Sequence, residues 1–142
     1  MQRTLDMYGP LVAEFDPAWR SPCEVGEPFA TEAGERIYFE PTARLFDQDF
    51  AGLENALETT VHPSVKSYYG AFWSAHLNAT ATDGPVSLLQ VWNEEDRERL
   101  VENLLGHYLV QRRAKAPLTL FFACTEADSD LILSVENQTG AV

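Results

Sequence analysis

Long apolar runs are missing from this sequence of 142 residues. No stretch approaches the ~18 consecutive apolar residues that a membrane-spanning helix needs. The opening residues, MQRTLDMYGP, contain no apolar segment of the kind that forms the centre of a signal peptide. The sequence therefore predicts no direct insertion into lipid: if the protein works at a membrane, it does so from outside the bilayer.

Positive charge is also scarce. Ten Lys and Arg stand against 22 Asp and Glu, which gives a formal net charge of −12. Residues 1–60 hold four of the basic and twelve of the acidic residues, so they contribute −8 of this charge. Phosphate backbones and anionic lipid headgroups repel such a chain, which excludes nucleic acid as a partner. The composition favours a cationic partner: a basic protein loop, a metal ion or a polyamine.

Cysteine and histidine, which supply many catalytic and metal sites, are few. Cys23 and Cys124 are predicted to be reduced thiols rather than a disulfide. His62 is expected to pack or cap at a helix start, His76 to lie on the polar face of a strand, and His107 to be a structural histidine. The three histidines lack the i, i+4 spacing of a zinc site, and neither a Gly-x-Ser-x-Gly motif nor a phosphate-binding loop occurs. We predict no cofactor and no catalytic site, and a hydrolase using His107 with a carboxylate is the weakest hypothesis.

One acidic run has the spacing that begins a calcium loop. Glu126, Asp128 and Asp130 alternate as the first ligands of an EF-hand do, but the glycine and the closing glutamate are missing at the expected offsets. This run is therefore predicted to be a solvated turn, with no metal.

What the sequence does have is enough apolar material for one core. Its 45% hydrophobic residues and its length fit a single domain over residues 1–142. Prolines and glycines interrupt residues 9–35, so residues 1–35 are predicted to be a loop-rich opening segment.

Beyond that segment, the apolar spacing changes between the helical and the strand period. It predicts two short helices, one long helix that Asn93 caps and Pro117 stops, a hairpin, and two late strands covered on both faces. The order contains no alternating βαβ units, so the fold class is α+β, with a mainly antiparallel sheet packed against helices. The helices are expected over 47–59, 63–72 and from residue 94 to about 113, and the strands over 36–40, 74–80, 86–92, 118–124 and 131–135.

A series of local motifs in fixed order covers most of residues 21–140. They are Ser21-Pro22-Cys23, His62-Pro63 with Tyr68-Tyr69, Leu88 to Trp92 running into Glu94-Glu95-Asp96, Glu102 to His107, Lys115 to Phe121, Ser134 to Asn137, and Thr139-Gly140. Together these motifs resemble the Syd family of SecY-interacting proteins, within the SMI1/KNR4-type (SUKH) superfamily. Members of that family extend further at both ends, so this chain is expected to be short of its family before Ser21 and after Gly140 and to leave a sheet edge less covered.

The resemblance implies a function without chemistry. Syd-like proteins bind the cytosolic face of SecY, the core of the protein-translocation channel, and monitor or restrain misassembled channel from a peripheral position on the inner membrane. An acidic surface facing basic channel loops is implied as the means of binding. The alternative is an immunity protein, because other SUKH domains neutralise bacterial toxins.

The candidate partner-binding residues surround the predicted start of the long helix, with one more near the C-terminal motif. Each has a simpler interpretation beside it: carboxylates in a first helical turn stabilise the helix dipole, and a tryptophan before a helix cap is commonly a core residue. The candidates are Glu94, Glu95, Asp96, Glu98, Trp92 and Glu136.

Overall fold

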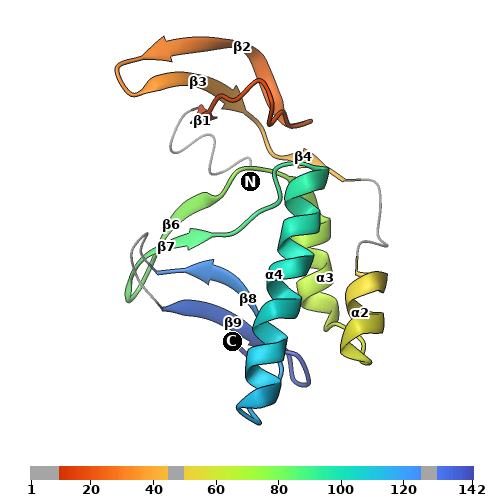
Figure 1. The fold of residues 1–142 in the computed structure, drawn as a ribbon. Coiled ribbons are helices and arrows are strands. Elements are labelled where there is room, and N and C mark those ends of the chain that lie inside the picture. Colours follow the sequence, from red (N-terminus) through yellow and green to blue (C-terminus); the bar gives the residue numbers. More distant parts are fainter. Residues whose placement is uncertain (1–9, 45–49, 126–130) are drawn as a thin grey trace.

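The computed structural model describes residues 10–44, 50–125 and 131–142. Helices and antiparallel sheets make up this part of the chain, which confirms the α+β class. Figure 1 shows the helices α2, α3 and α4 together on one side of a four-stranded sheet, with a separate three-stranded sheet beyond the N-terminal end of α4. In chain order the elements are β1 (Leu11–Glu14), β2 (Glu24–Thr31), β3 (Gly34–Phe39), β4 (Thr42–Ala43), α2 (Ala51–Leu57), α3 (Pro63–Gly70), β5 (Phe72–Trp73), β6 (Leu77–Ala81), β7 (Gly84–Leu88), α4 (Glu94–Arg113), β8 (Thr119–Cys124) and β9 (Ile132–Glu136).

The three-stranded sheet corrects the prediction of a loop-rich opening segment. Its order is β1-β3-β2, and only β3 was expected as a strand. The prolines and glycines of this region lie where the ladder is interrupted: Gly26 and Pro28 fall between Val25 and Phe29, where the pairing of β2 with β3 shifts register. Because β2 is largely exposed on both faces, it has no apolar run that would reveal it in the sequence.

The main core lies between the helices and the four-stranded sheet. The predicted apolar stripe of α3 is in place, with Val65 and Tyr69 buried against Leu104 of α4 and Leu120 of β8. The predicted start of the first short helix, residues 47–49, lies outside the described residues, and α2 is observed from Ala51.

Helix α4 matches its prediction closely. Asn93 caps it, since its side chain accepts a hydrogen bond from the Asp96 N–H at 2.9 Å. Arg112 and Arg113 occupy the last turn, where cations suit the negative end of the helix dipole. Leu104 is its buried residue, while Leu109 is 45% exposed.

The four-stranded sheet has the order β6-β7-β8-β9. The hairpin β6–β7 and the central place of β8 confirm two predictions. The prediction that the last strand is central is wrong, because β9 is an edge strand and Ile132 is 42% exposed. A short apolar run fits a central strand or an edge strand with one covered face equally well, so the sequence does not separate the two.

Candidate partner-binding surface

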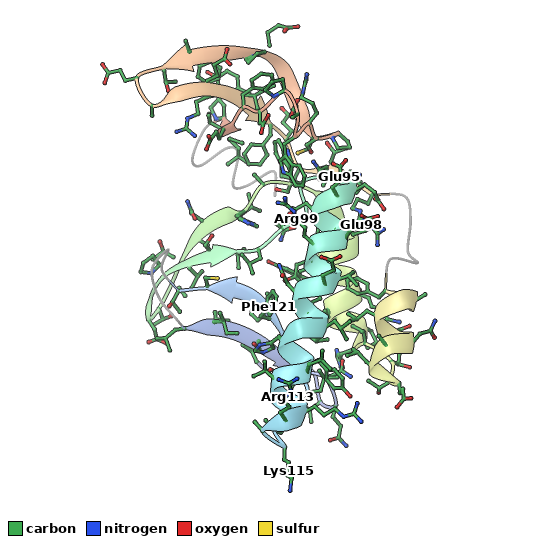
Figure 2. The ribbon with its side chains drawn as sticks, viewed as in Figure 1. Glu95, Glu98, Arg99, Arg113, Lys115 and Phe121 are labelled. Atoms are coloured by element: carbon green, nitrogen blue, oxygen red, sulfur yellow. The ribbon has the colours of Figure 1, made fainter. Side chains whose placement is uncertain are left out.

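The four acidic candidates of α4 lie on its first two turns, but they differ in what they contact. Glu94 forms an ion pair with Arg97, with Oε1 2.5 Å from Nη2. Asp96 is a capping residue, because its Oδ2 accepts the Trp92 N–H at 2.9 Å while its own N–H donates to Asn93. Within the part of the chain that the structure describes, no hydrogen bond or ion pair engages the carboxylates of Glu95 and Glu98, and both residues are exposed (Figure 2). These two carboxylates are therefore the most available to a partner.

Trp92 belongs to the core, which corrects its prediction as a contact residue. Its side chain is 8% exposed and lies edge-to-face with Phe39 at 5.8 Å between ring centroids. The indole Nε1–H donates to the Trp19 carbonyl at 2.8 Å. Because a buried indole needs a hydrogen-bond partner for its N–H, this bond favours the interpretation of Trp92 as a core residue.

Glu136 is far from the other candidates. It is half-buried on β9, pairs with Thr119 of β8, and accepts a hydrogen bond from the Thr139 hydroxyl. The side chain of Gln111, near the end of α4, holds Thr119 through the Thr119 N–H at 3.1 Å. Since a helix rises ~1.5 Å per residue, Glu136 lies roughly 25 Å from the first turn of α4. The structure does not bring it into the same surface.

The three-stranded sheet, which was not predicted, also belongs to this surface. Three hydrogen bonds fix the segment before β2 to the start of α4. Besides the Trp92 indole bond to Trp19, Asn93 Nδ2–H donates to the Arg20 carbonyl at 3.0 Å, and Ser21 Oγ–H donates to the Trp92 carbonyl. Arg99 also lies over the Trp19 ring, with Cζ 4.5 Å from its centroid, rather than in the ion pair with Glu95 that the helical spacing allows. Elements far apart in the sequence thus share one end of the molecule.

This shared end carries a concentration of exposed carboxylates, and we call it the acidic end. The only hint in the sequence was the excess of negative charge in residues 1–60, since the contact with α4 joins residues more than 70 positions apart. The acidic end consists of Glu94, Glu95 and Glu98 of α4 with Glu14, Asp16, Glu27, Glu32, Glu35 and Glu40 of the three-stranded sheet and its flanking turns.

The opposite end of α4 is basic. Arg112, Arg113 and Lys115 are exposed there, and none of them pairs with a carboxylate among the described residues. Figure 2 shows Arg113 and Lys115 at the end of α4 opposite Glu95 and Glu98. We call these three residues the basic end; the 20 residues of α4 separate it from the acidic end by about 30 Å.

The three histidines have separate structural contacts. His62 caps α3, accepting the Ser64 N–H on Nδ1 at 3.2 Å, which confirms its predicted role. His76 Nδ1 accepts the Gln90 N–H at 3.0 Å. The Nε2 atoms of His107 and Gln111 lie 3.0 Å apart. Within residues 10–44, 50–125 and 131–142, no three His, Cys, Asp or Glu side chains gather as a metal site requires; the acidic run from Glu126 to Asp130 lies outside them.

The perturbed titratable groups are likewise structural. Burial raises the pKa of the Cys23 thiol, which is 1% exposed, and burial also raises the pKa of the Tyr69 hydroxyl. The Lys66 ammonium and the Val61 N–H hold the pKa of Glu54 below its usual value. Burial also raises the pKa of Tyr68, whose ring packs edge-to-face against Tyr69 with 4.9 Å between the ring centroids. Cys23 and Cys124 are both free thiols, as predicted.

Several motif residues have structural roles that the geometry now explains. The Asn137 side chain accepts the His62 N–H at 2.7 Å and donates to the Thr60 carbonyl at 2.9 Å, so the turn after β9 holds the segment before α3. Tyr69 donates its hydroxyl to the Phe121 carbonyl at 2.7 Å, which joins α3 to β8. These residues fix the elements to one another and do not form a contact surface.

The fold and the surface together define an α+β domain with oppositely charged ends, a class suited to contacts with a charged partner. None of the helices in the described residues is long and apolar enough to cross a membrane. The sequence matches the family described as Syd protein (SUKH-2) over residues 3–142, and the chain belongs to this family.

Individual relatives agree with this assignment. Protein Syd of Pseudoalteromonas atlantica is 44% identical over 129 residues, which cover 91% of this chain and 68% of the relative. Protein Syd of Psychromonas ingrahamii is 38% identical over 130 residues, covering 92% of this chain and 68% of the relative. Protein Syd of Colwellia psychrerythraea is 35% identical over 147 residues, covering 99% of this chain and 73% of the relative.

Proposed function

We propose that this chain is a SecY-binding regulatory protein that acts at the cytosolic face of the bacterial inner membrane. In this proposal the acidic end engages basic cytosolic loops of the channel, and the protein monitors or restrains misassembled channel. Membership of the Syd family supports the choice of partner. The role is one of binding rather than catalysis, and it needs no cofactor.

The observation that carries the proposal is the gathering of exposed carboxylates at the acidic end. Glu95 and Glu98 stand there without a cationic partner among the described residues, beside the acidic three-stranded sheet. Cytoplasmic loops of membrane proteins are enriched in Lys and Arg, which makes them complementary to such a surface. The anionic lipid around the channel repels the same surface, so attachment depends on SecY and the protein stays peripheral.

The test is retention of SecY by the immobilised protein from detergent-solubilised inner membranes at low salt. The double variant Glu95→Lys/Glu98→Lys reverses the two available carboxylates and leaves the capping residue Asp96 in place. We expect it to retain at least about tenfold less SecY than the unaltered chain, because the reversed charges repel basic loops and slow their association. The matched control is Glu58→Lys/Asp83→Lys, which makes the same change in net charge at two exposed positions outside the acidic end and should retain SecY as the unaltered chain does.

Failure of the unaltered chain to retain SecY at low salt would reject the proposed partner. Equal loss in both double variants would mean that net charge alone governs binding, with no role for the acidic end in particular. The immunity alternative is not favoured, because the family match falls on Syd.

A further inference from the structure

A groove runs between the three-stranded sheet and the hairpin β6–β7. One part of it is a cavity of about 440 Å³, lined on one side by Leu11 and Val12 of β1 and on the other by residues 77–80 of β6. A second cavity of about 200 Å³ has walls that include Glu14 of β1 and Asp96 of α4. His76 lines both cavities, so they are neighbours, and Asp96 places the second at the start of α4; we call the two together the groove.

The first wall of this groove is an unpaired strand edge. Among the described residues, β1 is an outer strand of its sheet and pairs with β3 alone. The Phe15 N–H donates to the Glu35 carbonyl at 3.0 Å, so the odd-numbered residues of β1 direct their backbone groups toward β3. Because backbone direction alternates along an antiparallel strand, Val12 and Glu14 direct their N–H and C=O groups away from β3, toward the open edge.

The second wall is an unpaired edge as well. Within the part of the chain that the structure describes, β6 is an outer strand and pairs with β7 alone. The Leu89 N–H donates to the Phe122 carbonyl at 2.9 Å, so odd residues of β7 face β8 and even ones face β6. Leu77 and Ala79 pair with the even residues of β7, so their backbone N–H and C=O groups point toward β7. Asn78 and Thr80, both exposed, direct theirs toward the open edge.

The residues that line the groove indicate what kind of chain could bind in it. Leu11, Phe39 and Leu77 supply an apolar floor, while Glu14 and Asp96 supply carboxylates near the start of α4. Among the described residues that line either cavity there is no Lys or Arg. Two strand edges with unused hydrogen-bonding groups are a template for an extended chain, and the carboxylates favour basic side chains on that chain.

We propose that the groove binds an extended basic segment of a partner protein as an added β-strand between β1 and β6. Backbone bonds to Val12, Glu14, Asn78 and Thr80 hold the segment, its apolar side chains face the floor of the groove, and its alternate, basic side chains face outward toward Glu14 and the acidic end. The inference rests on the proposed function for the basic character of the partner, and it adds the form in which that partner is held.

The test uses the full chain and a synthetic peptide of about seven residues in which lysine alternates with valine. Amide hydrogen exchange is followed by NMR with and without the peptide. We expect exchange of the Val12, Glu14, Asn78 and Thr80 amides to slow at least about tenfold at saturation. The amides of Ala13 and Ala79, which already face neighbouring strands, should change little.

One modified peptide and one variant of the protein distinguish strand addition from charge attraction. The same peptide N-methylated at its valines keeps its charge and loses the N–H donors of one edge, so its affinity should fall at least about tenfold. On the protein, Thr80→Pro removes one edge N–H and should weaken binding, whereas the control Thr80→Val keeps that N–H and should bind as the unaltered chain does.

Three results would overturn the inference: equal affinity for the N-methylated peptide, peptide binding without slower exchange at the four amides, or amides that are already protected in the free chain because the chain itself or a second copy occupies the groove. The proposed function is judged separately by SecY retention. If Thr80→Pro leaves SecY retention unaffected and the peptide does not add as a strand, the groove proposal is rejected and SecY remains the proposed partner. If the peptide adds as a strand but SecY is not retained, the proposed partner is rejected and the groove proposal stands.

Discussion

Single residues of the family motifs hold the ends of the fold together. His62 illustrates this role, because its ring caps α3 and also packs against the backbone of Gly140, while its N–H is held by Asn137. The sequence shows His62-Pro63 and Thr139-Gly140 as separate motifs nearly 80 positions apart. Their contact could not be predicted, because nothing in local spacing reports which distant backbone lies against an imidazole ring.

Gly140 is the residue at which this contact is tested most directly. It has φ +75°, and an added Cβ would lie 2.5 Å from Cε1 of His62. Gly140→Ala should lower the free energy of unfolding by about 2 kcal/mol or more, since it combines strain at positive φ with a displaced ring. Urea denaturation measures the loss.

The control for this change is Gly106→Ala within α4, where an added Cβ meets nothing within 4 Å. That variant should gain up to about 1 kcal/mol, because alanine suits a helix interior better than glycine does. Equal effects of the two variants would show that the His62 contact does not contribute to stability.

At the scale of elements, α4 is the structure around which the others are arranged. Its length and its cap were predicted from the sequence, because caps and helix stops are local signals that tertiary packing did not override. β1 and β2 were missed for the opposite reason. Their ladders are short and interrupted, and only long-range pairing with β3 makes them strands.

Asn93 connects α4 to the three-stranded sheet. Its Oδ1 caps α4, and its Nδ2–H donates to the Arg20 carbonyl ahead of β2. Asn93→Ala should cost about 1–2 kcal/mol of unfolding free energy through the lost cap, with a further loss from the unpaired carbonyl. It should also speed amide exchange in β1, β2 and β3 more than in β8, which NMR measures residue by residue.

Asn103→Ala is the matched control, because it removes an exposed asparagine within the same helix. It should leave stability unchanged or slightly raised, as alanine has the higher helix propensity. Uniform acceleration of exchange in Asn93→Ala would mean that the three-stranded sheet and α4 open as one unit, contrary to this expectation.

For the whole molecule, charge and its placement are separate properties. The net charge of −12 and its excess in residues 1–60 were evident from the composition. The addition of the three-stranded sheet's carboxylates to the acidic end was not, because it depends on that sheet docking at the first turn of α4. The sequence brought Glu94, Glu95, Asp96 and Glu98 together at the start of α4, but it could not show that Trp92 is buried or that Glu136 pairs with Thr119 near the other end of the helix.

A chain with this net charge repels itself, and salt should relieve the repulsion. Raising NaCl from about 10 to about 150 mM should therefore raise the Tm, by an amount on the order of a few degrees. Glu32→Lys/Glu35→Lys, which lowers the net charge from −12 to −8 within the acidic end, should have a higher Tm at low salt and a weaker dependence on salt.

Glu32→Asp/Glu35→Asp keeps the charge and serves as the control in calorimetric scans. Its salt dependence should match that of the unaltered chain. A Tm that falls with salt would show that attractions such as Lys66 to Glu54 outweigh the repulsion.

The two charged ends of α4 also give the molecule a direction before it touches anything. In the field of a positively charged surface, attraction on one end and repulsion on the other produce a torque that turns the long axis of the helix toward that surface. Rotational diffusion then needs to sample fewer orientations for each encounter to succeed, and this gain comes from where the charges lie rather than from how many there are.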